Sequence, residues 1–152
     1  MSINRPTKFV FLAIASVAGL GVLLLSGPGC FHVTVSDSNC YYGEVCVCDG
    51  VGSCDYDCPG GDCEFVCNGM GTCDFYCPGG GCIATNNGTG TASLDCPGGD
   101  CTMVGNSTGT TDLTCTGGYC DLTCNSTGTC TLSGCDGTCD LICSGVGTCI
   151  EE

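Results

Sequence analysis

One 19-residue frame repeats through most of the sequence and limits its fold more than any other feature. The stretch that opens at Cys54 reads CDYDCPGGDCEFVCNGMGT, the next opens at Cys73, and the frame recurs at positions 92, 111, 130 and 149. A fixed period near twenty residues is typical of solenoids, in which each repeat forms one coil and packs on its neighbours. We therefore expect a stack of coils.

Two positions of the repeat are apolar in each of the five stretches that open at residues 54, 73, 92, 111 and 130. Counted from the first cysteine as zero, they are position 2 (Tyr56, Phe75, Leu94, Leu113, Leu132) and position 11 (Phe65, Ala84, Met103, Leu122, Leu141). Their neighbours are mostly Asp, Thr or Ser, and this alternation is the period of a strand with one buried face. The pattern predicts an all-β, disulfide-rich, two-faced β-solenoid of about five to six coils over residues 40–152.

Two kinds of turn separate the two strands of each coil. One is PGGD or a relative, as at residues 59–62, and the other is N-[GS]-x-G-T, as at residues 68–72. We expect Gly and Asn in both turns to supply the positive-φ conformations that tight corners need.

Cysteine content places the chain in an oxidising compartment. The sequence has 21 cysteines in 152 residues, a density typical of small disulfide scaffolds. The alternative is a thiolate metal binder, but His32 is the only histidine and no C-x-x-C pair occurs. We expect structural disulfides, no metal centre and no cofactor.

The repeat also indicates which cysteines pair. Position 13 and the next position zero lose their cysteines together, at Asn86 with Ala92 and at Gly105 with Thr111. The simplest scheme closes each turn with its own disulfide, since short turns hold Cα atoms within bridging distance. A rival scheme that joins equivalent cysteines of adjacent coils, such as Cys48–Cys67, stays open. The expected pairs are Cys40–Cys46, Cys48–Cys54, Cys58–Cys63, Cys67–Cys73, Cys77–Cys82, Cys96–Cys101, Cys115–Cys120, Cys124–Cys130, Cys135–Cys139 and Cys143–Cys149.

The net charge of −14 excludes one class of partner. Arg5 and Lys8 are the only cations, and both precede the repeats. A surface without basic contacts repels phosphate backbones, so we expect no binding to nucleic acid.

The first thirty residues have the pattern of a secretory signal. A short basic segment precedes an apolar run from Phe9 to Leu25, and SGPG then leads into Cys30. Small residues directly before a cysteine resemble the lipobox of bacterial lipoproteins, although Gly27 stands where that family usually has leucine. The resemblance implies cleavage before Cys30, acylation of its thiol and anchoring to a membrane.

Cysteine parity supports this interpretation. Twenty cysteines follow Cys30 and can pair completely, which leaves Cys30 as the odd one. We expect a signal peptide at 1–29, a lipidated N-terminus and linker at 30–39, and the repeat domain at 40–152. Simple secretion and an uncleaved signal anchor remain the alternatives.

Threonine and aspartate ladders are the candidate ligand sites. Thr recurs at position 18 (Thr72, Thr91, Thr110, Thr129, Thr148) and in three coils at position 16 (Thr89, Thr108, Thr127). This T-G-T stack resembles the Thr-x-Thr arrays of ice-binding β-solenoids, but we expect these threonines in a turn. PGGD is similar to part of the GGxGxD repeat of calcium-binding β-rolls. That similarity makes Asp55, Asp57, Asp62, Asp74 and Asp100 weak candidates for calcium, against a solvated acidic face.

No constellation in the sequence indicates catalysis. A nucleophile would lack its base, since His32 stands two residues from Cys30, and nothing indicates a cleft around Asp55 and Asp57. We expect a non-enzymatic lipoprotein of the bacterial envelope, on the periplasmic or cell-surface side, with a structural or adhesion-like role toward protein or envelope polysaccharide. The alternative is a module that binds calcium or ice.

Overall fold

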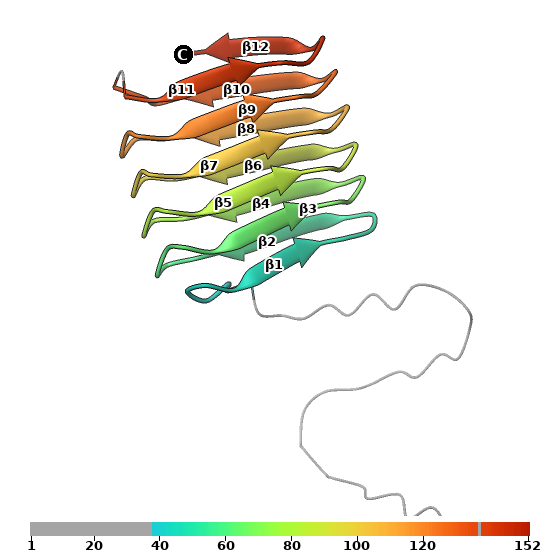
Figure 1. The fold of residues 1–152 in the computed structure, drawn as a ribbon. Helices are drawn as coiled ribbons and strands as arrows, with labels where there is room; N and C mark the ends of the chain where they lie inside the picture. The colour runs from blue at the N-terminus through green and yellow to red at the C-terminus, as the bar shows by residue number, and fades with distance from the viewer. Residues whose placement is uncertain (1–37, 137) are drawn as a thin grey trace, which may run out of the picture. The chain divides into compact units, whose positions relative to one another are not determined.

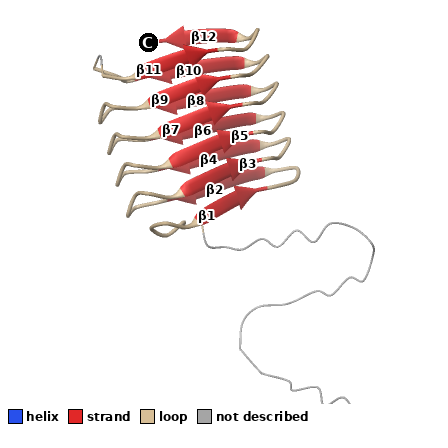
Figure 2. Cartoon of the chain, viewed as in Figure 1, coloured by secondary structure: helices blue, strands red, loops and turns tan. Residues whose placement is uncertain are grey.

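The structure is a computed structural model that describes residues 38–136 and 138–152. Its twelve strands form two six-stranded parallel sheets, and each coil gives one strand to each sheet (Figures 1 and 2). The predicted all-β solenoid of about six coils is confirmed. The odd sheet contains β1 (Val45–Cys48), β3 (Glu64–Cys67), β5 (Ile83–Asn86), β7 (Thr102–Gly105), β9 (Asp121–Cys124) and β11 (Asp140–Cys143). The even sheet contains β2 (Ser53–Asp57), β4 (Thr72–Tyr76), β6 (Thr91–Asp95), β8 (Thr110–Thr114), β10 (Thr129–Ser133) and β12 (Thr148–Glu151).

Every strand pairs with the strand one repeat away, so the sequence period becomes the strand register. Phe75 lies beside Leu94 in the even sheet, and Phe65 lies beside Ala84 in the odd sheet. The turns continue the same ladder, because the N–H of Thr72 donates to the carbonyl of Gly52. Each repeat position therefore becomes a straight column of side chains that runs along the solenoid.

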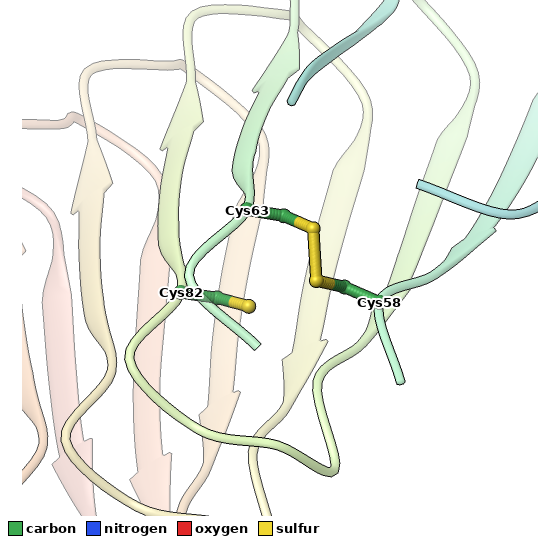
Figure 3. Close-up of side chains that lie close together, drawn as sticks. All are labelled: Cys58, Cys63 and Cys82. Carbon is green, nitrogen blue, oxygen red and sulfur yellow. A yellow bond between two sulfur atoms is a disulfide. The ribbon is translucent and has the colours of Figure 1, made fainter. Parts of the chain in front are cut away.

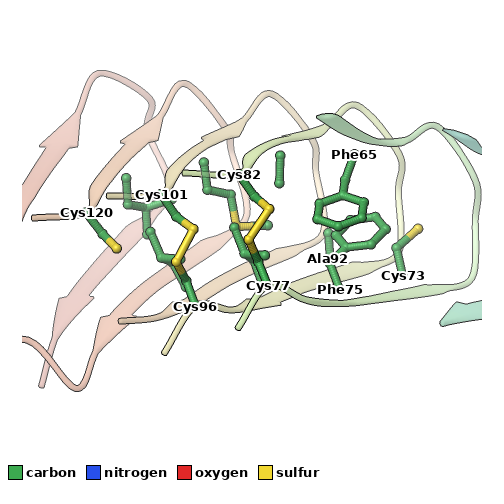
Figure 4. Packing of buried hydrophobic residues seen from close by; sticks show 14 of the residues in the cluster. Phe65, Cys73, Phe75, Cys77, Cys82, Ala92, Cys96, Cys101 and Cys120 are labelled. Carbon is green, nitrogen blue, oxygen red and sulfur yellow. A yellow bond between two sulfur atoms is a disulfide. The ribbon is translucent and has the colours of Figure 1, made fainter. Parts of the chain in front are cut away.

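The core is a single layer of side chains between the two sheets. The rings of Phe65 and Phe75 stack with centroids 4.6 Å apart (Figure 4). Buried leucines and Met103 continue the two inward columns. Disulfides flank this layer on both sides and are themselves buried over most of the stack. Burial of so thin an apolar layer offsets only part of the conformational entropy that the chain loses on folding, and the disulfides that close the turns offset much of the rest.

A polar cluster replaces the disulfide where two successive turns lack cysteines. Asn86 is fully buried, and its Nδ2 lies 3.1 Å from Ser107 Oγ, 3.0 Å from the Thr110 carbonyl and 3.0 Å from Thr111 Oγ1. Its Oδ1 accepts from the N–H of Gly88. One amide thus links two coils in the middle of the stack.

The glycines of the two turns serve different needs, which corrects one expectation. In the PGGD turns the third residue and the fourth both have positive φ, as at Gly61 (76°) and Asp62 (56°). In the N-[GS]-x-G-T turns no asparagine has positive φ, and Gly109 lies so close to the coil below that a Cβ would overlap the carbonyl oxygen of Gly90. Close stacking of the turns, not corner conformation, selects glycine there.

The expectations for the N-terminal part lie mostly outside the described residues. These are the signal peptide at 1–29, the acylated Cys30 and the linker up to residue 37. The described chain begins beside the first coil, where the N–H of Cys40 donates to the carbonyl of Asp57 and Asn39 bridges to the same residue. Among the described residues no helix has the length and apolarity to span a membrane.

Candidate functional site: the disulfides and the outer faces

Each disulfide of the structure closes one turn of the solenoid. There are ten, with sequence separations of 4 to 6 and Cα–Cα distances of 5.9 to 6.5 Å, inside the range that disulfides require. They are the ten pairs of the turn-closing scheme, and none joins equivalent cysteines of adjacent coils. They account for all twenty cysteines that follow Cys30.

The disulfides on the PGGD side form an unbroken stack, which we call the sulfur column. It holds one disulfide for each turn from an even strand to the next odd strand, and neighbouring rungs lie next to each other (Figure 4). Cys40–Cys46 closes the corresponding turn before β1. On the opposite side the stack is interrupted by the polar cluster around Asn86. The sulfur column consists of Cys58–Cys63, Cys77–Cys82, Cys96–Cys101, Cys115–Cys120 and Cys135–Cys139.

The position-18 threonines lie on the outer face of the even sheet, not in a turn as the sequence suggested. Each is the first residue of a strand, and each is in register with its neighbours, as Thr91 is with Thr72 and Thr110. Strand pairing begins at these threonines because the backbones of the preceding turns already hydrogen-bond to the adjacent coil. The position-16 threonines, such as Thr108, stay in the turns. The structure therefore separates the T-G-T pairs into a strand column and a turn column.

The candidate aspartates lie in three places. Asp55 and Asp74 are register neighbours on the outer face of the even sheet, and Asp57 lies at the end of β2. Asp62 and Asp100 lie in PGGD turns two coils apart. A Cβ on the intervening Gly81 would lie 2.5 Å from Asp62 Oδ1, so glycine leaves room for that carboxylate, in line with the alternation seen in the sequence.

These carboxylates do not converge on a common point. Within residues 38–136 and 138–152, the groups of three possible ligand atoms within 4.8 Å of one another are built from cysteines, joined in one case by Glu44. None of those groups contains the five candidate aspartates. The five candidate carboxylates are instead spread over the outer face of the even sheet and the PGGD turns.

A ladder of exposed amides runs along the other turn and was missed at the sequence level. The Nδ2 of each asparagine donates to Oδ1 of its equivalent one coil below, at 3.2, 3.1 and 3.1 Å for Asn87, Asn106 and Asn125. Asn68 begins the ladder and donates to the carboxylate of Asp49 at 2.9 Å. The signal was present in position 14, which reads Asp followed by four Asn, but we interpreted these residues only as turn formers.

The outer face of the odd sheet has a different chemistry. Its position-12 column consists of β-branched residues only, none of them charged, and its ends Val47 and Ile142 are 42% and 53% exposed. A second outward column of the odd sheet, position 10, includes Glu64, Asp121 and Asp140, so carboxylates stand on both faces. The even sheet presents threonine and aspartate without a β-branched column of this kind. The six members of the β-branched column are Val47, Val66, Thr85, Val104, Thr123 and Ile142.

One shallow hollow lies near the C-terminal coils. It is too narrow to admit a water molecule and is lined by Cys124, Ser126, Gly145, Gly147, Thr148 and Cys149. Both cysteines belong to disulfides, and no acidic or basic side chain lines it. The hollow therefore offers neither a nucleophile with a base nor a pair of carboxylates.

Comparison with known families, with characterised proteins and with solved structures finds no match to this chain. Fold and geometry alone define its class: a β-solenoid of two parallel sheets in which disulfides close most of the turns.

Proposed function

We propose that the protein is a non-enzymatic lipoprotein of the bacterial cell envelope or surface, anchored through acylated Cys30, with a structural or adhesion-like role. The observation that carries the proposal is the cysteine count. Ten disulfides use every cysteine after Cys30, so the residue at the lipobox position needs no partner. The basic start, the apolar run and the small residues before Cys30 support the same conclusion.

The geometry of the repeat domain supports a structural or interaction role. Two flat faces extend along a covalently pinned stack, one rich in threonine and aspartate and the other carrying the β-branched column. Of the sixteen acidic residues, all but Asp37 lie in the described domain, which has no Lys or Arg. Such a rigid acidic surface suits a protein or polysaccharide partner with cationic or hydroxyl groups more than a small substrate.

Intact mass and partitioning test the anchor. Expressed in a bacterium with a lipoprotein export pathway, the protein should lose residues 1–29, gain the mass of a diacylglycerol and its fatty acids, and enter the detergent phase on Triton X-114 separation. The matched control is Cys30→Ala, which should lack the acyl mass. An intact wild-type mass that retains residues 1–29 would refute lipidation and favour a signal anchor.

The threonine column favours a second candidate, a ligand-binding face on the even sheet. Thr72, Thr91, Thr110, Thr129 and Thr148 begin consecutive strands, so their hydroxyls repeat along a flat face at the strand spacing of about 4.8 Å. The ligand would be ice bound by the threonines, or calcium bound together with the neighbouring aspartates.

Two measurements separate this candidate from a purely structural role. Thermal melts with calcium and with chelator should differ in midpoint if calcium binds the folded form. Ice recrystallisation assays should show inhibition that is lost in Thr110→Tyr, whose side chain would stand above the face, and kept in Thr108→Tyr in the turn. If neither assay responds, the ligand-binding candidate is wrong.

A further inference from the structure

The sulfur column brings cysteines of different disulfides into contact range. The Sγ atoms of Cys58, Cys63 and Cys82 all lie within 4.8 Å of one another, although Cys82 is bonded to Cys77 in the next coil (Figure 3). Two further groups have the same composition, one disulfide plus one sulfur of an adjacent rung. They are Cys77 with Cys96 and Cys101, and Cys115 with Cys135 and Cys139.

Backbone spacing makes a bond between rungs feasible. Equivalent positions of paired parallel strands lie about 4.8 Å apart, which falls within the 4.4–6.8 Å Cα separation of disulfides. The N–H of Ile83 donates to the carbonyl of Cys63, so the parallel ladder extends to the cysteines that precede β3 and β5. A bond such as Cys63–Cys82 can therefore form without separating the coils.

Of the five rungs of the column, only the last is reached from solvent. Cys40–Cys46, which closes the corresponding turn before β1, has a partly exposed Cys46 but, among the described residues, shares no close group of sulfurs with the first rung. The eight cysteines of the first four rungs are at most 1% exposed, whereas Cys135 and Cys139 in the fifth rung are partly exposed. A dissolved thiol can reach the fifth rung directly and cannot reach the others in the folded chain. The rung that solvent reaches is the one whose sulfurs also lie near Cys115 of the buried column.

We propose that the sulfur column relays thiol–disulfide exchange from coil to coil, with Cys135–Cys139 as the rung that opens first. A small thiolate attacks Cys139, forms a mixed disulfide with it and releases the Cys135 thiolate. Cys135 then attacks Cys115, the Cys115–Cys120 bond breaks, and Cys120 leaves as the new thiolate. Each step makes one S–S bond and breaks one, so the number of disulfides is conserved and no oxidant is needed.

The relay allows buried disulfides to undergo thiol–disulfide exchange although no dissolved thiol reaches them. Buried structural cysteines are ordinarily inert because no thiolate reaches them. Here the attacking thiolate comes from the neighbouring rung and moves inward without unfolding. Mispaired rungs formed during oxidation are corrected by the same route. The inference goes beyond the proposed envelope role and does not depend on it.

The variant Cys139→Ser in a Cys30→Ala background tests the relay, because it leaves Cys135 as the single thiol. The purified protein is held at about pH 8, where exchange proceeds, then alkylated and digested with pepsin in acid, which halts exchange. Trypsin is unsuitable because the repeats contain no Lys or Arg. The relay predicts a Cys115–Cys135 linked peptide and alkylated Cys120.

Two controls separate relay from general scrambling. The same variant alkylated at Cys135 before incubation should keep Cys115–Cys120 intact. Cys149→Ser in the same background leaves its thiol at Cys143 on the opposite side of the coil and should put no label on Cys115 or Cys120. If label in Cys139→Ser stays on Cys135 alone, or if Cys149→Ser labels the column equally, the relay is wrong.

Wild-type protein provides a test that needs no folded variant. With substoichiometric glutathione followed by alkylation, the relay predicts label on buried Cys120 while far-UV circular dichroism still reports intact sheets. Label confined to Cys135 and Cys139 would show that the thiol does not move, and would overturn the proposal.

Discussion

Replacing Asn86 by alanine should destabilise the solenoid far more than replacing its neighbour Asn87. Asn86 is buried, and its side chain holds four polar groups: the hydroxyls of Ser107 and Thr111, the carbonyl of Thr110 and the N–H of Gly88. Each buried group left without a partner costs about 1–3 kcal/mol. Each of the two hydroxyls loses a donor but keeps its own proton to donate elsewhere, so we count only the carbonyl and the N–H and expect a loss of about 3 kcal/mol.

That loss is a large fraction of the 5–15 kcal/mol that ordinarily separates folded from unfolded domains. It corresponds to a fall of roughly 10–15 °C in Tm for a domain of this size. Urea titration followed by far-UV circular dichroism, with disulfides intact, measures it. Asn87→Ala removes exposed ladder bonds and should cost about 1 kcal/mol or less. Equal losses in the two variants would refute the argument that the buried amide stands in for the absent disulfide.

Three further predictions follow from the column geometry. The double variant Asn86→Cys, Ala92→Cys should form an eleventh disulfide, since the equivalent residues Cys67 and Cys73 are bridged in the coil below. Alkylation followed by mass analysis should then find neither new cysteine modified; alkylation of both would count against the prediction. Gly109→Ala should cost more than about 2 kcal/mol in urea titration because its Cβ overlaps a backbone carbonyl, whereas Gly60→Ala, with its nearest contact at 3.5 Å, should cost under about 1 kcal/mol. Asn87→Asp should lower stability at pH 7, because a carboxylate cannot donate to the oxygen below it. The loss should vanish at about pH 3, because the new carboxyl is then protonated in the folded and the unfolded chain and can donate to the oxygen below it; the unfolded chain ionises this group only above about pH 3.9. A loss of stability that persists in acid would be inconsistent with the ladder.

The sequence was sufficient for the architecture because the repeat turns local pattern into register. A strict period of 19 places residue i beside residue i+19, so the inward columns of Phe75 and Phe65 could be assigned without a structure. Paired loss of cysteines, as at Asn86 and Ala92, permitted the turn-closing scheme and its inter-coil rival, and the short turns favoured the turn-closing disulfides. Both inferences rest on comparing one coil with the next within a single chain.

The side-chain details depended on contacts between coils that pattern alone does not show. The glycine before position 18 indicates a turn, yet Thr91 begins strand β6. The role of Gly109 depends on how closely two turns stack, and that of Asn87 on which way its amide points. The sulfur triads, such as Cys82 beside Cys58 and Cys63, likewise require coordinates.

Non-reduced peptide mapping of the mature protein tests the central claim most directly. Free thiols are alkylated in acid, the chain is cut with pepsin, and linked peptides are identified by mass spectrometry. A solenoid with turns closed by disulfides predicts no alkylated cysteine after Cys30 and only local pairs such as Cys48–Cys54 and Cys67–Cys73. Linked peptides joining adjacent coils, such as Cys48 with Cys67, or several free thiols would contradict it.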